Sequence, residues 1–285
     1  MKNQHTGLVL EGGAMRGLFT AGVIDVFMES DIEFPACVGV SAGAAFGCNL
    51  KSRQIGRAIR YNTRFCKEPK YCSVRSLLKT GDIFGAEFCY HKIPDELDVF
   101  DVQTYESNPM AFYVVCSDVE TGKPYYKRLD KAGYECYEWI RASASMPLVS
   151  KVVEIGDKKL LDGGMTDSIP LAFMEKQYAK NVVVLTQPIN YIKKPASLMW
   201  LFKQSLKKYP KMIEAIANRH NAYNQTRDYI FAQERAGKAF VICPKEPLPI
   251  GKIEHDPENM RKIYALGRKV AEEKLEELRQ FLSQE

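Results

Sequence analysis

The chain has 285 residues, of which 46% are hydrophobic and 26% charged, and its formal net charge is +5 with a pI near 8.6. This composition is typical of a globular protein with one large domain, or with one domain plus an extension. The weak positive charge, without a Lys/Arg-rich run, excludes nucleic acid as an expected partner and is compatible with an anionic lipid surface. No segment approaches the run of about 18 apolar residues that a membrane-spanning helix needs.

The cysteines and the start of the chain indicate where the protein works. The eight cysteines are scattered and form no C-x-x-C, which predicts free, buried thiols in a reducing compartment. The first predicted turn is reached by Gly12, which leaves no room for a signal peptide. We therefore expect a cytoplasmic location, with peripheral membrane contact as a variant of it, and the sequence makes no prediction about the oligomeric state.

Strands and helices alternate along the chain. Apolar runs predict strands at 7–10, 36–38, 111–116, 152–155, 159–161, 182–185 and 240–243. Helical patterns predict helices at 18–29, from 44 onward, at 131–143, 170–178, within 196–233 and at 258–284, with helical and irregular structure over 51–101. This order predicts an α/β fold in which a mostly parallel sheet is sandwiched between helices in three layers. Active sites of such sheets lie at the carboxyl ends of the strands.

The most informative motif is Gly39–Gly43, which reads G-V-S-A-G. It lies between the predicted strand at 36–38 and a small-residue helix start, which is the context of a nucleophile elbow. Ser41 would then be lifted out of the sheet at the positive end of a helix. The turn leaves no space for a side chain on either flank, so Gly39 and Gly43 fill these positions. The motif alone is short enough to occur by chance.

A glycine-rich turn, Glu11–Gly17 (E-G-G-A-M-R-G), joins the strand at 7–10 to the helix at 18–29. Such a turn leaves backbone N–H groups free to face an anion, so it is compatible with phosphate binding or with an oxyanion hole. The P-loop and G-x-G-x-x-G spacings are both absent, which disfavours a phosphate loop. Arg16 opposes the helix dipole, which indicates an anion or a carbonyl oxygen nearby.

A third motif, Leu161-Asp162-Gly163-Gly164, follows the predicted hairpin at 152–161. An isolated Asp-Gly-Gly is more often an ordinary turn. This one comes directly off an apolar strand, where a carboxylate can be presented to a site. A serine needs a base to become a nucleophile, and Asp162 is the candidate. A carboxylate is a weak base at its usual pKa of about 4, so Asp162 would have to be partly desolvated.

In their order and spacing these motifs resemble the patatin-like phospholipase family, in which a G-G-G-x-Arg/Lys-Gly loop precedes G-x-S-x-G and then D-G-G/A. The resemblance covers roughly residues 7–186. It implies a Ser–Asp dyad with Ser41 as nucleophile and Asp162 as base, without a metal or a cofactor. It also implies an oxyanion hole built from the glycine-rich loop, with Gly12, Gly13, Ala14, Arg16 and Gly17.

The same resemblance divides the chain and marks one departure. A patatin-like catalytic domain is expected over 1–190, and a helical extension with a late strand, packed on the same domain, over 191–285. Two weaker segments, 117–122 and 141–147, also look like the family. Ala14 stands where the family usually has a third glycine. Alanine still has an N–H, so the hole survives unless this position needs a positive φ.

The four histidines favour a dyad over a triad. A Ser–Asp–His hydrolase places its histidine after the acid in the chain, which leaves His220 and His255. Each lies in a polar context without small flanking residues, and we interpret both as ordinary solvated histidines. His91 precedes Asp162 and is out of order, and His5 lies before the first strand.

One segment, Ser197–Lys208, is apolar at its start and basic at its end. Lys211 extends the charge, while Pro210 limits the helix. Trp200 and Phe202 beside lysines suit an interfacial membrane helix. The alternative, a helix packing its apolar side on the core, is favoured.

The sequence thus predicts a serine hydrolase that cleaves carboxylic esters of phospholipids or related lipids. A small-ester esterase or an acyltransferase with the same dyad is the nearest alternative. An alternative of another class is a non-catalytic module that binds an anion or a nucleotide on the loop of residues 12–17.

Overall fold

The computed structural model describes residues 5–284. The strands are β1 (Thr6–Leu10), β2 (Ala36–Val40), β3 (Ala111–Asp118), β4 (Lys123–Arg128), β5 (Val153–Ile155), β6 (Lys158–Asp162), β7 (Lys180–Val184) and β8 (Ala239–Ile242). The first helices are η1 (Ala14–Arg16), α1 (Gly17–Glu29), α2 (Ala42–Lys51), α3 (Arg57–Phe65), α4 (Val74–Thr80), the π-helix η2 (Phe88–Leu97) and α5 (Val102–Ser107). The others are α6 (Tyr134–Ser143), η3 (Gly163–Met165), α7 (Leu171–Met174), α8 (Met199–Ser205), α9 (Pro210–Arg235), α10 (Pro257–Glu273) and α11 (Leu275–Ser283).

All eight strands form one sheet in the order β5-β6-β3-β2-β1-β7-β8, with β4 paired to β3. The run from β3 to β8 is parallel, whereas β4, β5 and β6 pair antiparallel at one end of the sheet. The predicted α/β class with a mostly parallel sheet between helices is therefore confirmed. None of the helices in residues 5–284 combines the length and the apolar character needed to cross a membrane.

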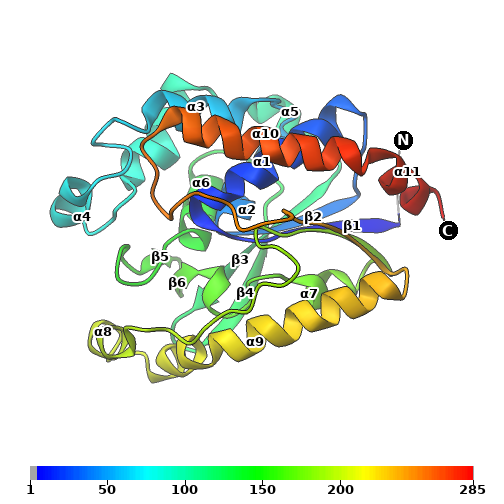
Figure 1. Ribbon diagram of the computed structural model, residues 1–285. Helices are drawn as coiled ribbons and strands as arrows, with labels where there is room; N and C mark the ends of the chain where they lie inside the picture. The colour runs from blue at the N-terminus through cyan, green and yellow to red at the C-terminus, as the bar shows by residue number, and fades with distance from the viewer. Residues whose placement is uncertain (1–4, 285) are drawn as a thin grey trace.

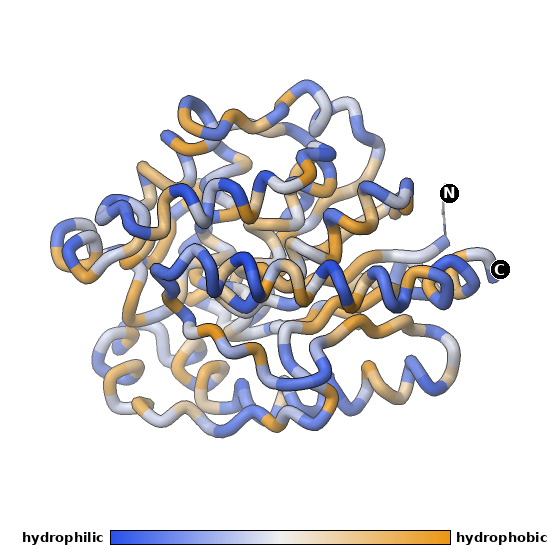
Figure 2. Tube along the Cα trace, turned by 45° about the horizontal axis from the view of Figure 1, so that its top comes forward, coloured by the Kyte–Doolittle hydropathy of each residue, from blue (hydrophilic) through white to orange (hydrophobic). Residues whose placement is uncertain are grey.

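Side chains of the central strands alternate between two buried faces, as the period of a strand requires. Leu8 and Leu10 point into a core shared with α1, α2, α6 and α10, and Val9 points into a second core shared with α7 and α9. Figure 1 shows these two helical layers on opposite sides of the sheet. In Figure 2 hydrophobic residues concentrate in the strands, while the outer helices mix both kinds.

The segment expected as an extension packs on the same body. Strand β8 pairs with β7, and α10 lies against α1, where a Cβ on Gly22 or Gly267 would clash with the facing backbone. The single long helix predicted over 258–284 is instead two helices with a turn at Lys274. The turn allows Phe281 of α11 to pack on Phe240 of β8, with ring centroids 5.6 Å apart.

Two other predicted helices differ in extent. The helix predicted over 170–178 is a single turn, α7, because the chain has to re-enter the sheet as β7 at Lys180. Within 196–233, the chain forms α8 and then α9, and Pro210 occupies the first turn of α9, where its missing N–H costs nothing.

Candidate active site

Ser41 lies in the sharp turn between β2 and α2, with φ 55° and ψ −119°. A non-glycine residue rarely adopts this conformation, and such strain is concentrated at functional sites. The two glycines of the motif serve close packing: a Cβ on Gly39 would clash with the Gly43 carbonyl, and one on Gly43 with the Leu10 carbonyl. The sequence-based expectation of a turn with no space on either flank matches this geometry.

A buried hydrogen-bond chain holds the backbone of the turn. The N–H of Ser41 donates to Ser143 Oγ at 2.9 Å, and Ser143 Oγ donates to the Val115 carbonyl at 2.6 Å. Ser143 is fully buried at the end of α6. Ser143 belongs to the segment 141–147, which resembled the family in the sequence but had no assigned role. The structure shows that this segment holds the backbone of Ser41 through a hydrogen bond.

Strand pairing places Asp162 beside Ser41. Strand β4 occupies one edge of β3 from Tyr113 to Asp118, so β2 and β6 share the other edge. On that edge Val40 pairs with Val115, and Asp162 pairs with the next residue, Cys116. The last residue of β6 therefore follows directly after the end of β2 along one strand, and two side chains 121 positions apart (162 − 41) meet.

The Asp162 carboxylate is buried, with 3% of the residue exposed. It accepts hydrogen bonds from the Ser41 hydroxyl and from the N–H of Gly164, the latter at 2.7 Å. Burial raises the pKa of Asp162 above its usual value, and these hydrogen bonds together with the charge of Arg219 only partly oppose the shift. The partial desolvation that a carboxylate base needs is present.

Arg219 was missed by the sequence reasoning. It lies on α9, in the expected extension, and its Nε donates to the Gly164 carbonyl while its charge acts on Asp162. Nothing in the local sequence around Arg219 marks it, because its role depends on α9 crossing the carboxyl ends of the strands. A second α9 residue, Tyr223, donates from its hydroxyl to Glu11 at 2.5 Å.

The glycine-rich loop packs directly on the serine turn. A Cβ on Gly12 would lie 2.9 Å from Ser41 Cβ, so only glycine fits there. Within residues 5–284, no acceptor is found for the backbone N–H groups of Gly12, Gly13 and Ala14. Glu11, which precedes them, is fixed by the Thr186 N–H at 2.6 Å. The loop thus presents open donors beside Ser41.

Ala14 adopts φ 49°, in the left-handed region that favours glycine, which is the condition under which alanine was expected to disturb the hole. Alanine nevertheless holds this conformation, and its N–H has no acceptor among residues 5–284. Because alanine pays for this conformation with a steric cost of about 1–2 kcal/mol, and glycine with about 0.5–1 kcal/mol of entropy, Ala14→Gly should raise the free energy of unfolding by up to about 1 kcal/mol. Chemical denaturation measures this change, and ester turnover should persist. A clearly destabilised variant would show that the methyl group of Ala14 contributes packing that outweighs its strain.

Several cationic side chains lie near the glycine-rich loop. Arg16 Nε is buried and has no hydrogen-bond partner among the described residues, and Gly17 packs on Ala42. Lys193 Nζ lies 4.1 Å from the centroid of the Tyr223 ring. Burial, and then the charges of Arg219, Arg16 and Lys252, lower the pKa of Lys193 to about 8. A negative group bound here would relieve this mutual repulsion.

The histidines lie elsewhere. His91 Nε2 pairs with Glu138 at 2.9 Å, His220 Nδ1 with the Ala217 carbonyl, and His255 Nδ1 with the Cys66 carbonyl. None of these three contacts Ser41 or Asp162. His5 lies before β1, at the amino end of that strand, whereas the candidate site is at the carboxyl ends.

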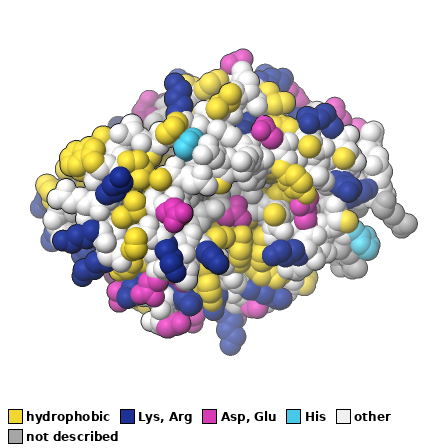
Figure 3. Space-filling model, turned by 90° about the horizontal axis from the view of Figure 1, so that it is seen from below, with side chains coloured by type: hydrophobic (Ala, Val, Ile, Leu, Met, Phe, Trp, Pro, Cys, Tyr) yellow, Lys and Arg dark blue, Asp and Glu magenta, His cyan; other side chains and the backbone are white. Residues whose placement is uncertain are grey.

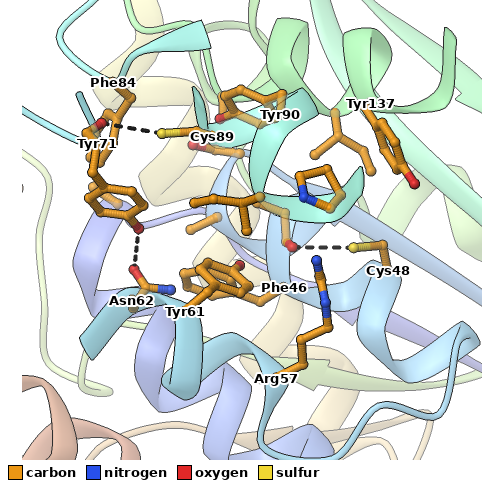
Figure 4. A pocket seen from close by; sticks show the side chains of 18 of the residues that line it. Phe46, Cys48, Arg57, Tyr61, Asn62, Tyr71, Phe84, Cys89, Tyr90 and Tyr137 are labelled. Atoms are coloured by element: carbon orange, nitrogen blue, oxygen red, sulfur yellow. Dashed lines mark hydrogen bonds between the residues drawn. The ribbon is translucent and has the colours of Figure 1, made fainter. Parts of the chain in front are cut away.

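An apolar cavity opens beside Ser41 and extends between α3 and η2, where it spans about 910 Å³ of space that includes open solvent at its mouth. Figure 4 shows side chains that line it. Its apolar lining includes Met15, Phe46, Phe84, Ile93, Tyr137, Ile140 and Met146. Two of the polar groups in the wall are paired: Tyr71 donates to Asn62 at 2.6 Å, and Arg57 donates to the Asp98 carbonyl. The hydroxyls of Tyr61 and Tyr90 have no hydrogen-bond partner among residues 5–284. Such a cavity suits a hydrocarbon chain more than a polar ligand.

The fold and this arrangement define an α/β protein with a serine elbow, a buried carboxylate and an apolar cavity. A model of the patatin-like phospholipase family matches residues 8–174, more than half of the chain. The chain belongs to the patatin-like phospholipase family, which is a family of lipid hydrolases. A second model, of a domain family of unknown function (DUF6363), matches residues 209–283.

The chain is also similar to proteins of several organisms. An uncharacterised protein, YjjU of Escherichia coli K12, is 27% identical over 276 residues, which cover 92% of this chain and 74% of that protein. Lysophospholipase NTE1 of Debaryomyces hansenii is 25% identical over 203 residues, 67% of this chain but only 13% of that much longer protein. The structure of VipD from Legionella pneumophila aligns over 96% of this chain and 67% of its own at 13% identity, with a TM-score of 0.48.

Proposed function

We propose that this protein hydrolyses carboxylic esters of phospholipids or lysophospholipids through a dyad of Ser41 and Asp162. The observation that carries the proposal is the hydrogen bond between a strained, glycine-flanked serine and a buried carboxylate whose pKa is raised. A serine in this setting has the base it needs, and the base has the proton affinity it needs.

In the proposed reaction Ser41 Oγ attacks the ester carbonyl carbon while its proton passes to Asp162. The N–H groups of Gly13 and Ala14 donate to the resulting oxyanion. Collapse of this intermediate breaks the bond to the alcohol, which leaves with the proton from Asp162. Water then attacks the acyl group on Ser41 and gives its proton to Asp162. The fatty acid departs as that proton returns to the serine oxygen.

The surroundings favour a lipid substrate with a charged head. The apolar cavity begins at Ser41, where the acyl chain of the ester has to lie, and its lining is mainly apolar, which disfavours a nucleotide there. Arg16, Lys193 and Arg219 lie near the loop, where the alcohol half with a phosphate would leave. The lysophospholipase activity in the name of the NTE1 relative points the same way. A cytoplasmic location stays a prediction.

A fluorophosphonate probe tests this proposal, because it labels an activated serine. We expect labelling of the wild-type protein at Ser41, with turnover of p-nitrophenyl esters and of lysophosphatidylcholine. Turnover of short p-nitrophenyl esters alone would support the small-ester esterase, and transfer to an added alcohol would support the acyltransferase. A folded protein that neither reacts with the probe nor cleaves an ester would be a binding module.

A further inference from the structure

Two groups of large apolar side chains are exposed around one end of the molecule. On α4, Val74 is 66% and Leu78 83% exposed, although α4 has only seven residues. In the connection after β7, Ile192 is 73% exposed, and at the start of α8, Trp200 is 62% exposed. We call the set the apolar rim; its members are Val74, Leu78, Ile189, Ile192, Leu198 and Trp200. Single exposed apolar residues are ordinary, but a gathered set marks an interaction surface.

The fold does not need these side chains for its core. On α4 it is Leu77 that packs inward, on the cluster of Phe65, Tyr71 and Ile83. In the second group it is Phe202 that packs, with Leu206 and Met212. The segment Ser197–Lys208 therefore combines both sequence interpretations: Phe202 faces the core and Trp200 faces solvent.

The apolar rim surrounds the end of the sheet where the candidate active site lies. Figure 1 places α4 and α8 at the same end of the molecule, beyond the carboxyl ends of β1 and β2. Tyr71 and Phe84, which flank α4, line the cavity that starts at Ser41. On the other side, Lys193 contacts Tyr223, which bonds Glu11 of the glycine-rich loop. A lipid surface that contacts the apolar rim would therefore also lie close to the cavity.

The two segments that carry the apolar rim are positively charged. Residues 69–81 and 188–213 contain no Asp or Glu. Their cations are Lys70, Arg75, Lys79, Lys193, Lys194, Lys203, Lys207, Lys208 and Lys211. In the β5–β6 hairpin between them, Asp157 pairs with Lys158 at 3.4 Å, and Lys159 pairs with Glu120 at 2.7 Å. Seen from below, hydrophobic side chains gather at this end with Lys and Arg beside them (Figure 3).

We propose that the apolar rim and its lysines dock the protein on the surface of a bilayer that contains anionic lipids, with the mouth of the cavity facing the lipids. If this surface bound another protein, we would expect acidic side chains among its lysines to form ion pairs with the partner. Exposed Trp, Leu and Ile beside lysines that form no ion pair within residues 5–284 instead suit the boundary between lipid headgroups and acyl chains. The inference rests on the proposed function, because a lipid ester in the bilayer then enters the cavity without crossing water.

Sedimentation with vesicles tests the inference. The Ser41→Ala protein is used, so that the vesicles are not consumed, with phosphatidylcholine alone or mixed with phosphatidylglycerol. We expect binding to the mixed vesicles that weakens as salt is added, since ions screen the attraction. The double change Leu78→Ser and Trp200→Ser should weaken this binding about ten-fold or more, because both lose apolar area that would enter the lipid. The matched control is Val99→Ser with Val102→Ser, two exposed valines at the start of α5.

The rim variant in an otherwise wild-type chain should keep its melting temperature and its turnover of a soluble ester, because both side chains are mainly solvent-exposed. If the Ser41→Ala protein does not sediment while the wild type cleaves lysophosphatidylcholine, docking is wrong and the proposed function stands. Equal losses in the rim and control variants would also overturn docking. A dimer of the wild type that the rim variant converts to a monomer would assign the surface to a second copy of the chain instead.

Discussion

Ser41→Ala should abolish ester hydrolysis while the protein remains folded. The loss expected from removing a nucleophile is on the order of 10⁶-fold in turnover. Alanine keeps the N–H that donates to Ser143 and the Cβ that packs on Gly12, so the turn retains its supports. Turnover of a p-nitrophenyl ester and the thermal unfolding curve are the two measurements.

The matched control is Ser145→Ala, a second buried serine close to the site. Among residues 5–284, the Ser145 hydroxyl bonds only the Arg141 carbonyl, although the backbone carbonyl of Ser145 accepts from the Asp162 N–H at 2.8 Å. This variant should keep most of its activity. A folded Ser41→Ala protein with near wild-type turnover would remove Ser41 from the mechanism.

Asp162→Asn should reduce turnover by roughly 10⁴- to 10⁶-fold, since nucleophile and base act as a unit. Asparagine has the same shape and its oxygen can still accept from the Gly164 N–H, but it cannot take a proton. Because the folded state raises the pKa of Asp162, ionisation of this group near neutral pH opposes folding. The Asn variant should therefore melt at the same or a higher temperature. A strong drop in melting temperature would mean that the carboxylate is structural.

The pH dependence of wild-type turnover follows from the same raised pKa of Asp162. The base works only when ionised, so turnover should fall as the pH drops through a pKa above the ordinary aspartate value of about 3.9. Arg219→Gln removes a charge that holds the pKa of Asp162 down, and should move the acidic limb of the profile to higher pH. An unmoved limb would show that Arg219 acts only through its bond to Gly164.

The positions of the motifs between strand and helix, or at the end of a strand, could be predicted because each depends on neighbouring residues in the sequence. Ser41 is flanked by glycines that only a tight turn needs, and Asp162 ends a strand whose apolar pattern is visible in the sequence. The alternation of strands and helices fixed the class of fold for the same reason. The positive φ of Ala14 was foreseen only as a condition, since one sequence cannot show which backbone conformation a loop takes.

What could not be predicted depends on contacts between distant segments. Arg219 and Tyr223 lie in an ordinary polar helix, and only the crossing of α9 over the strand ends brings them to the loop and to Asp162. Ser143 is fully buried, but it lies in a run of small residues, and such runs occur in many structural contexts, so its bond to Ser41 could not be predicted. The proposed boundary near residue 190 falls between the segments that match the two family models. Residues from both sides of this boundary nevertheless meet at the candidate site.

The common edge of β3 has a consequence for how this site can change over evolution. Ser41 and Asp162 are spaced by the hydrogen-bond ladder of one strand, with Val40 and Asp162 on neighbouring rungs. Inserting or deleting one residue in β6 before Asp162 would turn the carboxylate to the opposite face of the sheet, because successive side chains alternate. The distance between Ser41 and Asp162 can therefore change only in whole steps of the strand register, whereas a loop outside this ladder can change its length without moving either side chain.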